Sequence, residues 1–239
     1  MKVTIVTPVY NGANTIQDCI DSIKLQDYPD IEHLVIDGNS TDNTLDIVKS
    51  NNIKYISEAD AGIYDAFNKG IRLATGDIVH ILNSDDMYAE KNIVSQVIQY
   101  MTDNNLDACH GYAEQINEKN EVVRRVGGVI TKKGLLSKMK VSHPSTFIKK
   151  DVYQKYGEYS VGFKIAADHE FLLRIWDKIN IGFLPIVTTK MRLGGASNSQ
   201  VTLSYRESFA AAILHGKPAI SALMKYYIEI IKNNFYKIS

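Results

Sequence analysis

Two adjacent carboxylates, Asp85 and Asp86, directly follow an apolar run at residues 78–82 of this 239-residue sequence. The run is short and rich in β-branched residues, which predicts a buried strand of a parallel sheet. Ligands of open α/β sheets bind beyond the carboxyl ends of the strands, so we expect residues 83–86 at the mouth of a site. Hard carboxylate oxygens suit Mg²⁺ or Mn²⁺, which would take further ligands from water and from a substrate's phosphates.

A simpler interpretation of the same residues involves no ligand. Ser84 or Asp85 could cap a helix predicted to begin near Lys91, or Asp85 and Asp86 could only make a turn. The residues alone leave both interpretations open.

Three further positions, in the second half of the chain, could take part in chemistry. Asp168 lies in the first turn of a predicted helix. It could act as a general base, or it could be an N-cap that adds roughly 1 kcal/mol to the stability of the fold. His143 lies in a loop before a predicted strand, where it either points into the site or fills a structural position. Residues 191–197 form a glycine-containing loop with Arg192 and Gly194, which suits a lid or a phosphate contact.

The elements that must position these side chains follow from hydrophobic periodicity. Four apolar segments predict strands at residues 3–6, 33–36, 53–56 and 78–82, and each of the first three is followed by a helix-period segment. We expect Thr7 and Pro8 to end the first strand, because proline lacks the N–H that a central strand needs. The alternation predicts an α/β fold with an open, mainly parallel sheet and helices on both faces.

Polar residues follow every one of these predicted strands. Because the carboxyl ends of parallel strands share one edge, we expect four clusters to meet there. They are residues 7–11 including Asn11, Asp37, Asp60 with Gly62, and residues 83–86.

The second half predicts mixed strands and a helical tail. Strands are expected at residues 107–115 and 122–126, paired as a hairpin, followed by a short basic helix at 132–140. We predict one continuous domain at residues 1–200, with a donor half at 1–90 and an acceptor half at 91–200. Residues 201–239 form a helical extension with helices at 202–214 and 219–235. This extension either packs on the domain or on a second subunit as a homodimer, or lies on a membrane surface near a lipid-linked acceptor.

Composition narrows the class of partner. The 27 basic and 27 acidic residues cancel, and no dense basic stripe occurs, which argues against nucleic acid. Cys19 and Cys109 have no metal-binding spacing and are expected to be buried. The apolar part of the N-terminal segment is too short for a signal peptide, and no apolar run approaches the ~20 residues that span a bilayer. We therefore expect a cytoplasmic protein, which could also contact the inner face of the plasma membrane.

Both common phosphate-binding loops are missing from the sequence. The first turn reads TPVYNG instead of GxGxxG, and GxxxxGK[ST] does not occur. A divalent ion at residues 83–86 is therefore the simplest way to neutralise a diphosphate.

Five ordered motifs, TPVYNG, HLVIDGNSTDNT, DAGIYDAFNKGI, ILNSDD and AADHEFLLRI, resemble the family 2 glycosyltransferases of the GT-A fold over residues 3–200. NSDD and DAFNKG resemble the branch with colanic-acid and other bacterial surface-polysaccharide enzymes. The resemblance implies a nucleobase pocket, with Asp37 reading the base edge, that is lined by Thr7, Pro8, Val9 and Tyr10. It implies a nucleotide and sugar side that is lined by Asp60, Gly62, Asp65 and Asn68.

The same resemblance assigns the reacting groups. Asn83, Ser84 and Asp85 occupy the family's DxD position, so Asp85 would be the main metal ligand with Asp86 as a helper. Asp168 occupies the aspartate of the ED motif, the catalytic base. The chain departs from the family pattern at three positions, which are Asn83 for Asp, Ala167 for Glu, and Phe67 where many members have Arg. Lys69 or Arg192 could then face the diphosphate.

These residues predict inverting transfer of a sugar from a nucleotide diphosphate sugar, with a UDP-sugar expected as donor and Mn²⁺ or Mg²⁺ as cofactor. The acceptor is expected to be a saccharide or a lipid-linked saccharide. Two other classes stay open, which are a nucleotidyltransferase that makes a nucleotide sugar and a non-catalytic sugar-nucleotide binding protein. The first usually needs a basic glycine-rich loop after its first strand, and the second would explain the loss of carboxylates at Asn83 and Ala167.

Overall fold

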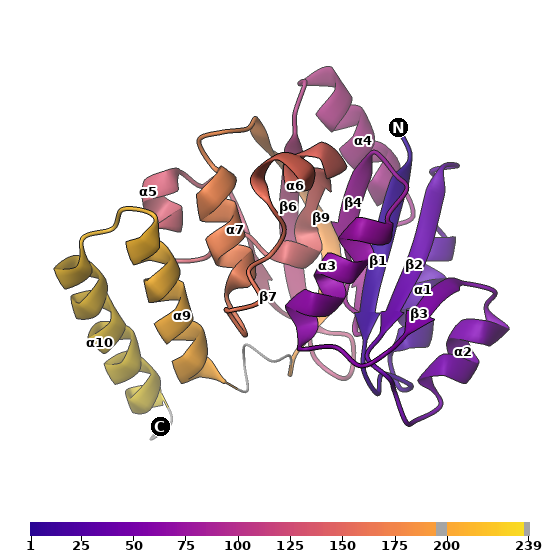
Figure 1. The fold of residues 1–239 in the computed structure, drawn as a ribbon, viewed down its shortest axis with the longest axis horizontal. Coiled ribbons are helices and arrows are strands. Elements are labelled where there is room, and N and C mark those ends of the chain that lie inside the picture. Colours follow the sequence, from indigo (N-terminus) through magenta and orange to yellow (C-terminus); the bar gives the residue numbers. More distant parts are fainter. Residues whose placement is uncertain (195–199, 237–239) are drawn as a thin grey trace.

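A computed structural model describes residues 1–194 and 200–236 of the chain (Figure 1). The strands are β1 (Val3–Val9), β2 (Ile31–Asp37), β3 (Lys54–Ser57), β4 (Ile78–Ile81), β5 (Asp86–Tyr88), β6 (Ala108–Ile116), β7 (Val122–Val126), β8 (Thr146–Lys149) and β9 (Ile181–Arg192). The helices are α1 (Ile16–Lys24), α2 (Thr44–Ser50), α3 (Ile63–Leu73), α4 (Ile93–Asp103), α5 (Lys132–Leu135), α6 (Lys150–Tyr156), α7 (Ala167–Ile175), α9 (Val201–Leu214) and α10 (Ala219–Tyr236). A 3₁₀ turn, η1 (His143–Ser145), precedes β8.

The first four strands form the predicted parallel sheet. Among the described residues the sheet has the order β3-β2-β1-β4-β8-β6-β9-β5, with β7 paired to β6. β1 pairs in parallel with β2 on one side and with β4 on the other, and β2 pairs in parallel with β3. The carboxyl ends of these strands therefore meet at one edge, as expected.

The predicted end of β1 at Thr7 and Pro8 is wrong. β1 continues to Val9 and pairs with β2 through Pro8 and Ile36. Proline is tolerated because pairing with β4 stops at Val6, whose carbonyl accepts the N–H of Leu82. The N–H that Pro8 lacks would point to that side, where the ladder has already ended.

The second half continues the same sheet with mixed pairing. β8 pairs antiparallel with β4 and with β6, and β6 forms the predicted hairpin with β7. Two strands were not predicted: β9, parallel to β6, and the short β5, antiparallel to β9. The predicted basic helix at 132–140 is shorter, since α5 ends at Leu135, and α6 was not predicted.

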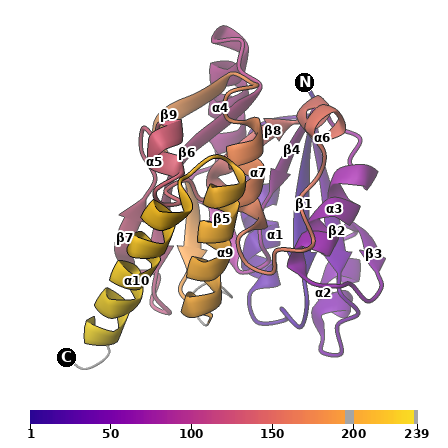
Figure 2. The same ribbon diagram turned by 60° about the vertical axis from the view of Figure 1, so that its left-hand side comes forward.

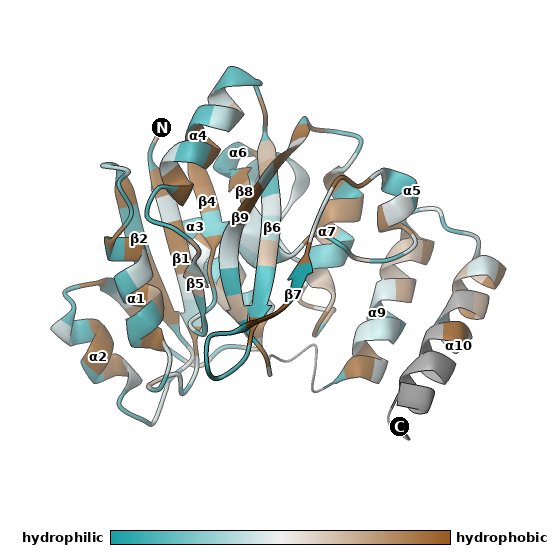
Figure 3. Ribbon diagram, turned by 180° about the vertical axis from the view of Figure 1, so that it is seen from behind, coloured by the Kyte–Doolittle hydropathy of each residue, from teal (hydrophilic) through white to brown (hydrophobic). Residues whose placement is uncertain are grey.

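Period-two alternation along the central strands builds a core on each face of the sheet. Val6, Val79 and Ile148 face one core, which is completed by α3, α6 and α7. Their neighbours in sequence face the other core with α1 and α4; these are Ile5, Ile78 and Phe147. Helices therefore cover both faces, as predicted, and Cys19 and Cys109 are buried free thiols. Figure 3 shows that β1 and β4 are largely hydrophobic; β7, whose sequence combines two arginines with three valines, is mostly exposed.

The C-terminal helices α9 and α10 form the predicted helical tail. α9 packs against α7 on one side and against α10 on the other (Figure 2). α10 exposes large apolar side chains, which include Ile220, Leu223 and Tyr227. No helix in the described part of the chain is both long and apolar enough to cross a bilayer. Contact of α10 with a membrane or a second subunit stays a prediction, as does the division of the chain at residues 90 and 200.

Close packing of α3 on β1 generates a stability prediction at Gly70. A Cβ added there would lie 2.2 Å from Cγ1 of Val6, a buried, β-branched side chain with little room to move. We expect Gly70→Ala to lower the free energy of unfolding by about 1–2 kcal/mol, because overpacking outweighs the gain in helix propensity. Urea unfolding measures this change.

The control for this substitution is Gly162→Ala. A Cβ at Gly162 meets nothing closer than Ser160 Oγ at 3.7 Å, so we expect a change within about 0.5 kcal/mol. Equal stability of Gly70→Ala and the wild type would contradict the described packing of α3 on β1.

Candidate active site

A cavity of about 640 Å³ lies between the end of β4, η1 and the start of α7. Its walls include the side chains that we expected to do chemistry and several basic residues from the second half. The predicted members are Asn83, Asp85, Asp86, His143, Asp168 and Arg192, and the basic ones are Arg124, Arg125, Lys138, Lys140 and Lys164. The structure therefore brings the carboxylates after β4 and the carboxylate of α7 into one space.

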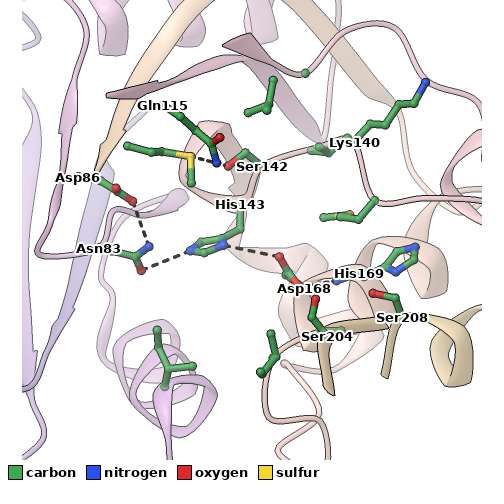
Figure 4. A pocket seen from close by; sticks show the side chains of 18 of the residues that line it. Asn83, Asp86, Gln115, Lys140, Ser142, His143, Asp168, His169, Ser204 and Ser208 are labelled. Atoms are coloured by element: carbon green, nitrogen blue, oxygen red, sulfur yellow. Dashed lines mark hydrogen bonds and ion pairs between the residues drawn. The ribbon is translucent and has the colours of Figure 1, made fainter. Parts of the chain in front are cut away.

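A chain of polar contacts crosses this cavity from Asp86 to Asp168 (Figure 4). Asn83 donates from Nδ2 to Asp86 Oδ2 at 3.0 Å, and Asn83 Oδ1 lies 3.3 Å from His143 Nε2. On its other side, His143 Nδ1 lies 3.6 Å from Asp168 Oδ2. His143 thus lies between the two carboxylate groups and points into the cavity, as one of the two interpretations predicted.

Two elements hold the ring of His143 in this place. The Phe67 ring from α3 packs against it at 5.2 Å between centroids. The buried His80 of β4 bonds to the carbonyl of Pro144 at 2.9 Å, which fixes the backbone of η1. Burial lowers the pKa of His80 to about 3, so this imidazole is neutral and acts as a structural hydrogen-bonding group.

Asp168 is the second residue of α7 and is not its N-cap, which is Ala166. Its Oδ1 accepts a hydrogen bond from the N–H of His169 at 2.8 Å and lies 3.2 Å from the hydroxyl oxygen of Tyr64, whose shorter bond is to the carbonyl of Ile165. Burial acts to raise the pKa of Asp168, but the hydrogen bond and charge of His143 and the N–H of His169 outweigh it and lower the pKa. The side chain is 17% exposed, so an ionised carboxylate faces the cavity.

Asp85 and Asp86 lie in a tight turn, since the N–H of Asp86 donates to the carbonyl of Asn83. The two residues therefore do make a turn, and their role as metal ligands stays a prediction. The capping interpretation is wrong, because α4 has Asn92 at its N-cap. Burial raises the pKa of Asp85, and burial followed by the charge of Asp85 raises the pKa of Asp86 well above its ordinary value. Ionising two buried, neighbouring carboxyl groups costs free energy, and a bound divalent cation lowers that cost.

The donor set fits a Mg²⁺ or Mn²⁺ ion that has few protein ligands. Within residues 1–194 and 200–236, no three His, Cys, Asp or Glu side chains lie close enough to bind a metal together. Asp85 and Asp86 would therefore supply the protein ligands, and water and a diphosphate the others.

Packing around two glycines shows that the other strand ends converge beside this turn. A Cβ on Gly12 would lie 3.2 Å from Ser84 Oγ, and a Cβ on Gly38 would lie 2.8 Å from Asp60 Oδ2 and 3.6 Å from Tyr10 Cβ. Asn11, at φ 51°, joins the first two loops, because its side chain accepts the N–H of Thr41.

Asp37 is completely buried at the end of β2, and it has one free oxygen. Oδ2 accepts hydrogen bonds from Ser57 Oγ at 2.6 Å and from the N–H of Ser40 at 3.1 Å. Oδ1 is one of three buried side-chain atoms in the described part of the chain that have no hydrogen-bond partner. An unpaired buried acceptor at this edge fits a ligand N–H.

Several other residues that were predicted to bind the nucleotide make hydrogen bonds within the protein. Thr7 bonds to His33 Nε2 at 3.0 Å in the interior, and both ends of the Asn68 amide bond to the backbone of Tyr159. Asp65 accepts the N–H of Ala61, and Asp60 accepts the N–H of Gly62 before α3. Pro8 and Val9 are buried in β1, while Tyr10 is 65% exposed. Their roles in binding a nucleotide stay predictions.

The two cations proposed for the diphosphate are both paired. Lys69 lies 2.9 Å from Glu58 Oε1 and 3.5 Å from Asp65 Oδ2, and Arg192 pairs with Asp18 and donates to the carbonyl of Asp85. Arg192 ends β9, and Gly194 follows at φ 115°. Residues 195–197 of the predicted lid lie outside the described residues.

Sequence reasoning missed several side chains of the cavity. Tyr64 belongs to one of the helix-period segments, and no local pattern indicates that its hydroxyl reaches Asp168, 104 residues away. Ser204 and Ser208 of α9 also line the cavity. Their spacing of four residues places them on one helix face, but the sequence does not indicate what that face contacts.

The order of the sheet, and the cavity lined by Asp85, Asp86 and Asp168 at its strand ends, agree with the predicted GT-A fold. The chain belongs to glycosyl transferase family 2, whose model matches residues 4–165. The chain is therefore a glycosyltransferase, as the five motifs predicted.

Two relatives extend this assignment. A PGL/p-HBAD biosynthesis glycosyltransferase of Mycobacterium bovis is 26% identical over 237 residues, which cover 95% of this chain and 91% of that protein. An uncharacterized glycosyltransferase of Mycobacterium tuberculosis is 32% identical over 180 residues, which cover 72% of this chain and 68% of that protein.

Two solved structures share the fold. S. aureus TarS 1-349 in complex with UDP-GlcNAc superposes with a TM-score of 0.73 at 17% identity, over 95% of this chain and 70% of that chain. The mannosyltransferase PcManGT from Pyrobaculum calidifontis, in complex with GDP-Man and Mn²⁺, gives a TM-score of 0.69 at 20% identity, over 94% and 69%.

The raised pKa of Asp85 generates a prediction for stability against pH. Just above the ordinary carboxyl pKa, the folded protein still binds a proton that the unfolded chain has released, so the free energy of unfolding falls as pH rises. Asp85→Asn does not titrate and avoids this fall. We expect the variant to be more stable by on the order of 1 kcal/mol near neutral pH, and equal to wild type below about pH 4.

Urea unfolding with a metal chelator present measures this difference across the pH range. Asp27→Asn, an exposed and isosteric change, is the control and should follow the wild-type curve. If Asp85→Asn is less stable than wild type at neutral pH, Asp85 makes a stabilising contact that our description lacks.

Proposed function

We propose that this glycosyltransferase inverts the anomeric centre as it transfers a sugar from a nucleotide diphosphate sugar to an acceptor hydroxyl. The supporting observation is that Asp85 and Asp168 line one cavity of about 640 Å³, in which His143 lies between Asn83 and Asp168. A cavity of this size can hold a sugar and part of an acceptor.

Asp168 is the general base in this proposal. It accepts the proton of the acceptor hydroxyl as that hydroxyl attacks the anomeric carbon. Its lowered pKa keeps it ionised near neutral pH, and Tyr64 and the N–H of His169 fix one oxygen while the other faces His143. Direct attack with a single base reverses the configuration, so an α-linked donor would give a β product.

The donor diphosphate would lie at the turn of residues 83–86. Asp85 and Asp86 would hold Mn²⁺ or Mg²⁺ there, and the bound cation would stabilise the leaving diphosphate as a Lewis acid. The buried, unpaired Oδ1 of Asp37 would accept an N–H from the nucleobase. Uracil and guanine both offer one, and the complexes of TarS with UDP-GlcNAc and of PcManGT with GDP-Man support either donor class. We expect UDP.

The acceptor side and the biological setting rest on the second half of the cavity and on the relatives. We propose a saccharide or lipid-linked saccharide acceptor, used in the synthesis of a bacterial surface polysaccharide at the inner face of the plasma membrane. The relative named for PGL/p-HBAD biosynthesis supports transfer to a glycoconjugate. Membership of a glycosyltransferase family disfavours the nucleotidyltransferase and the non-catalytic alternatives.

Substitution of Asp168 tests the proposed mechanism. We expect Asp168→Asn to lower turnover by ~10²–10⁴-fold, because a neutral amide cannot accept the proton. Binding of the nucleoside diphosphate should stay within about twofold, since Asp168 lies outside the turn of residues 83–86. A panel of UDP-, GDP- and dTDP-sugars with Mn²⁺ identifies the donor, and release of nucleoside diphosphate measures turnover.

Two variants complete this experiment. Asp177→Asn, an exposed change just after the same helix, should retain full turnover. Asp85→Asn should weaken nucleotide binding in Mn²⁺ but have little effect on it in chelator. Full turnover by Asp168→Asn would show that Asp168 is not the base.

A further inference from the structure

A carboxylate from the C-terminal helices holds the segment that leads to Asp168. Glu207 of α9 accepts three backbone N–H groups in a row, from Lys164 at 2.8 Å, Ile165 at 2.7 Å and Ala166 at 3.0 Å. Three short bonds to one carboxylate fix its orientation and that of the backbone it binds. The donors precede Glu207 by 41–43 residues, so this contact is made only in the folded protein.

The backbone before α7 needs such a group because the residues just before the helix supply no capping side chain. Residues 164–166 contain no Ser, Thr, Asp or Asn, and the N-cap residue Ala166 makes no side-chain capping bond. Helix N-termini leave N–H groups unpaired and carry a partial positive charge. Glu207 satisfies the N–H groups just before α7 and adds a negative charge at the favourable end of the helix.

The same short segment is held from its other side by α3. Tyr64 donates from its hydroxyl to the carbonyl of Ile165 at 2.7 Å and lies 3.2 Å from Asp168 Oδ1. The peptide groups of Ile165 are therefore fixed on one side by Glu207 and on the other by Tyr64. Asp168 follows only two residues after Ala166, so its position depends on both supports.

α9 itself is firmly placed against the catalytic helix. His215 near its end lies 3.0 Å from Glu170 Oε1 of α7, and Glu170 also pairs with Arg174. Ser204 and Ser208, on either side of Glu207 in sequence, line the cavity beside Asp168 (Figure 4). α9 therefore forms part of the wall on the side of the proposed base.

We propose that Glu207 is a positioning residue for sugar transfer, which holds residues 164–166 so that the carboxylate of Asp168 meets the acceptor hydroxyl. This inference rests on the proposed role of Asp168 as the general base. It makes α9 a component of the active site, although the family model ends at residue 165. A misplacement of the reacting groups by about 1 Å lowers turnover by roughly 10²-fold.

Kinetics of three variants test this role at a temperature where circular dichroism shows each to be folded. We expect kcat to fall by roughly 10–100-fold in Glu207→Ala and by a smaller factor in Glu207→Gln, which keeps one acceptor oxygen. The KM of the donor should stay within about twofold, because the donor turn is not touched. Arg206→Ala, an exposed neighbour on α9, should match the wild type.

The pH profile separates positioning from a general loss of stability. The acid limb of kcat reports the ionisation of the base in the complex. In Glu207→Ala we expect this limb to move to higher pH, because Asp168 loses its fixed place beside His143 and the N–H of His169, which lower its pKa. A loss of folded protein alone would lower kcat equally at every pH.

Amide hydrogen exchange, followed by mass spectrometry, gives a readout that needs no substrate. Exchange should speed up at residues 164–168 in Glu207→Ala and stay unchanged in the strands of the first half. Unchanged exchange in that segment, or wild-type kcat in Glu207→Ala, would overturn the inference. Full activity of Asp168→Asn would instead overturn the proposed function, so the two failures can be told apart.

Discussion

The antiparallel pairing of β4 with β8 is the constraint on which the rest of the site depends. Because the two strands run in opposite directions, the residues that precede β8 lie beside the residues that follow β4. His143 therefore meets Asn83, although 60 residues separate them. The same pairing joins the parallel half of the sheet to the mixed half, and Asp85 and Asp168 line the same cavity. A parallel β8 would carry His143 to the opposite end of the strand.

The pKa values of the cavity's carboxyl groups are shifted in opposite directions by their surroundings. Burial raises the pKa of Asp85, and burial together with the charge of Asp85 raises the pKa of Asp86, whereas His143 and the N–H of His169 lower the pKa of Asp168. The first pair is costly to the folded protein without a cation, and the second arrangement is stable without a ligand. All three residues are aspartates, so their surroundings alone suit two of them to binding a cation and the third to accepting a proton.

Much of the fold followed from patterns that act over short distances. Period-two strands, helix-period segments and the rule that polar residues gather at strand ends were sufficient to predict β1–β4 and the convergence of their polar ends. The expectation that Asp168 faces the same site came from the resemblance to the family motifs. β9 was missed because Gly182 and Pro185 interrupt its pattern, and its pairing with β6 is irregular at that point. The bonds of Asn68 to the backbone of Tyr159 also have no local signal, since 91 residues separate the two. Reasoning from motifs assigns such a side chain to a ligand when the fold uses it to join two segments.

The family match covers one part of the proposed active site and leaves another part outside it. The matched residues 4–165 contain the turn of residues 83–86, Asp37 and His143, which are the groups that we propose bind the donor. Asp168 and α9 follow the matched segment, and Asp168, Ser204 and Ser208 line the side of the cavity from which the acceptor approaches in the proposed mechanism. A base whose place is set by backbone bonds to a carboxylate on a separate helix can be repositioned by changes in that helix, with no change to the donor turn. The acceptor side can therefore vary while the chemistry at the diphosphate stays the same.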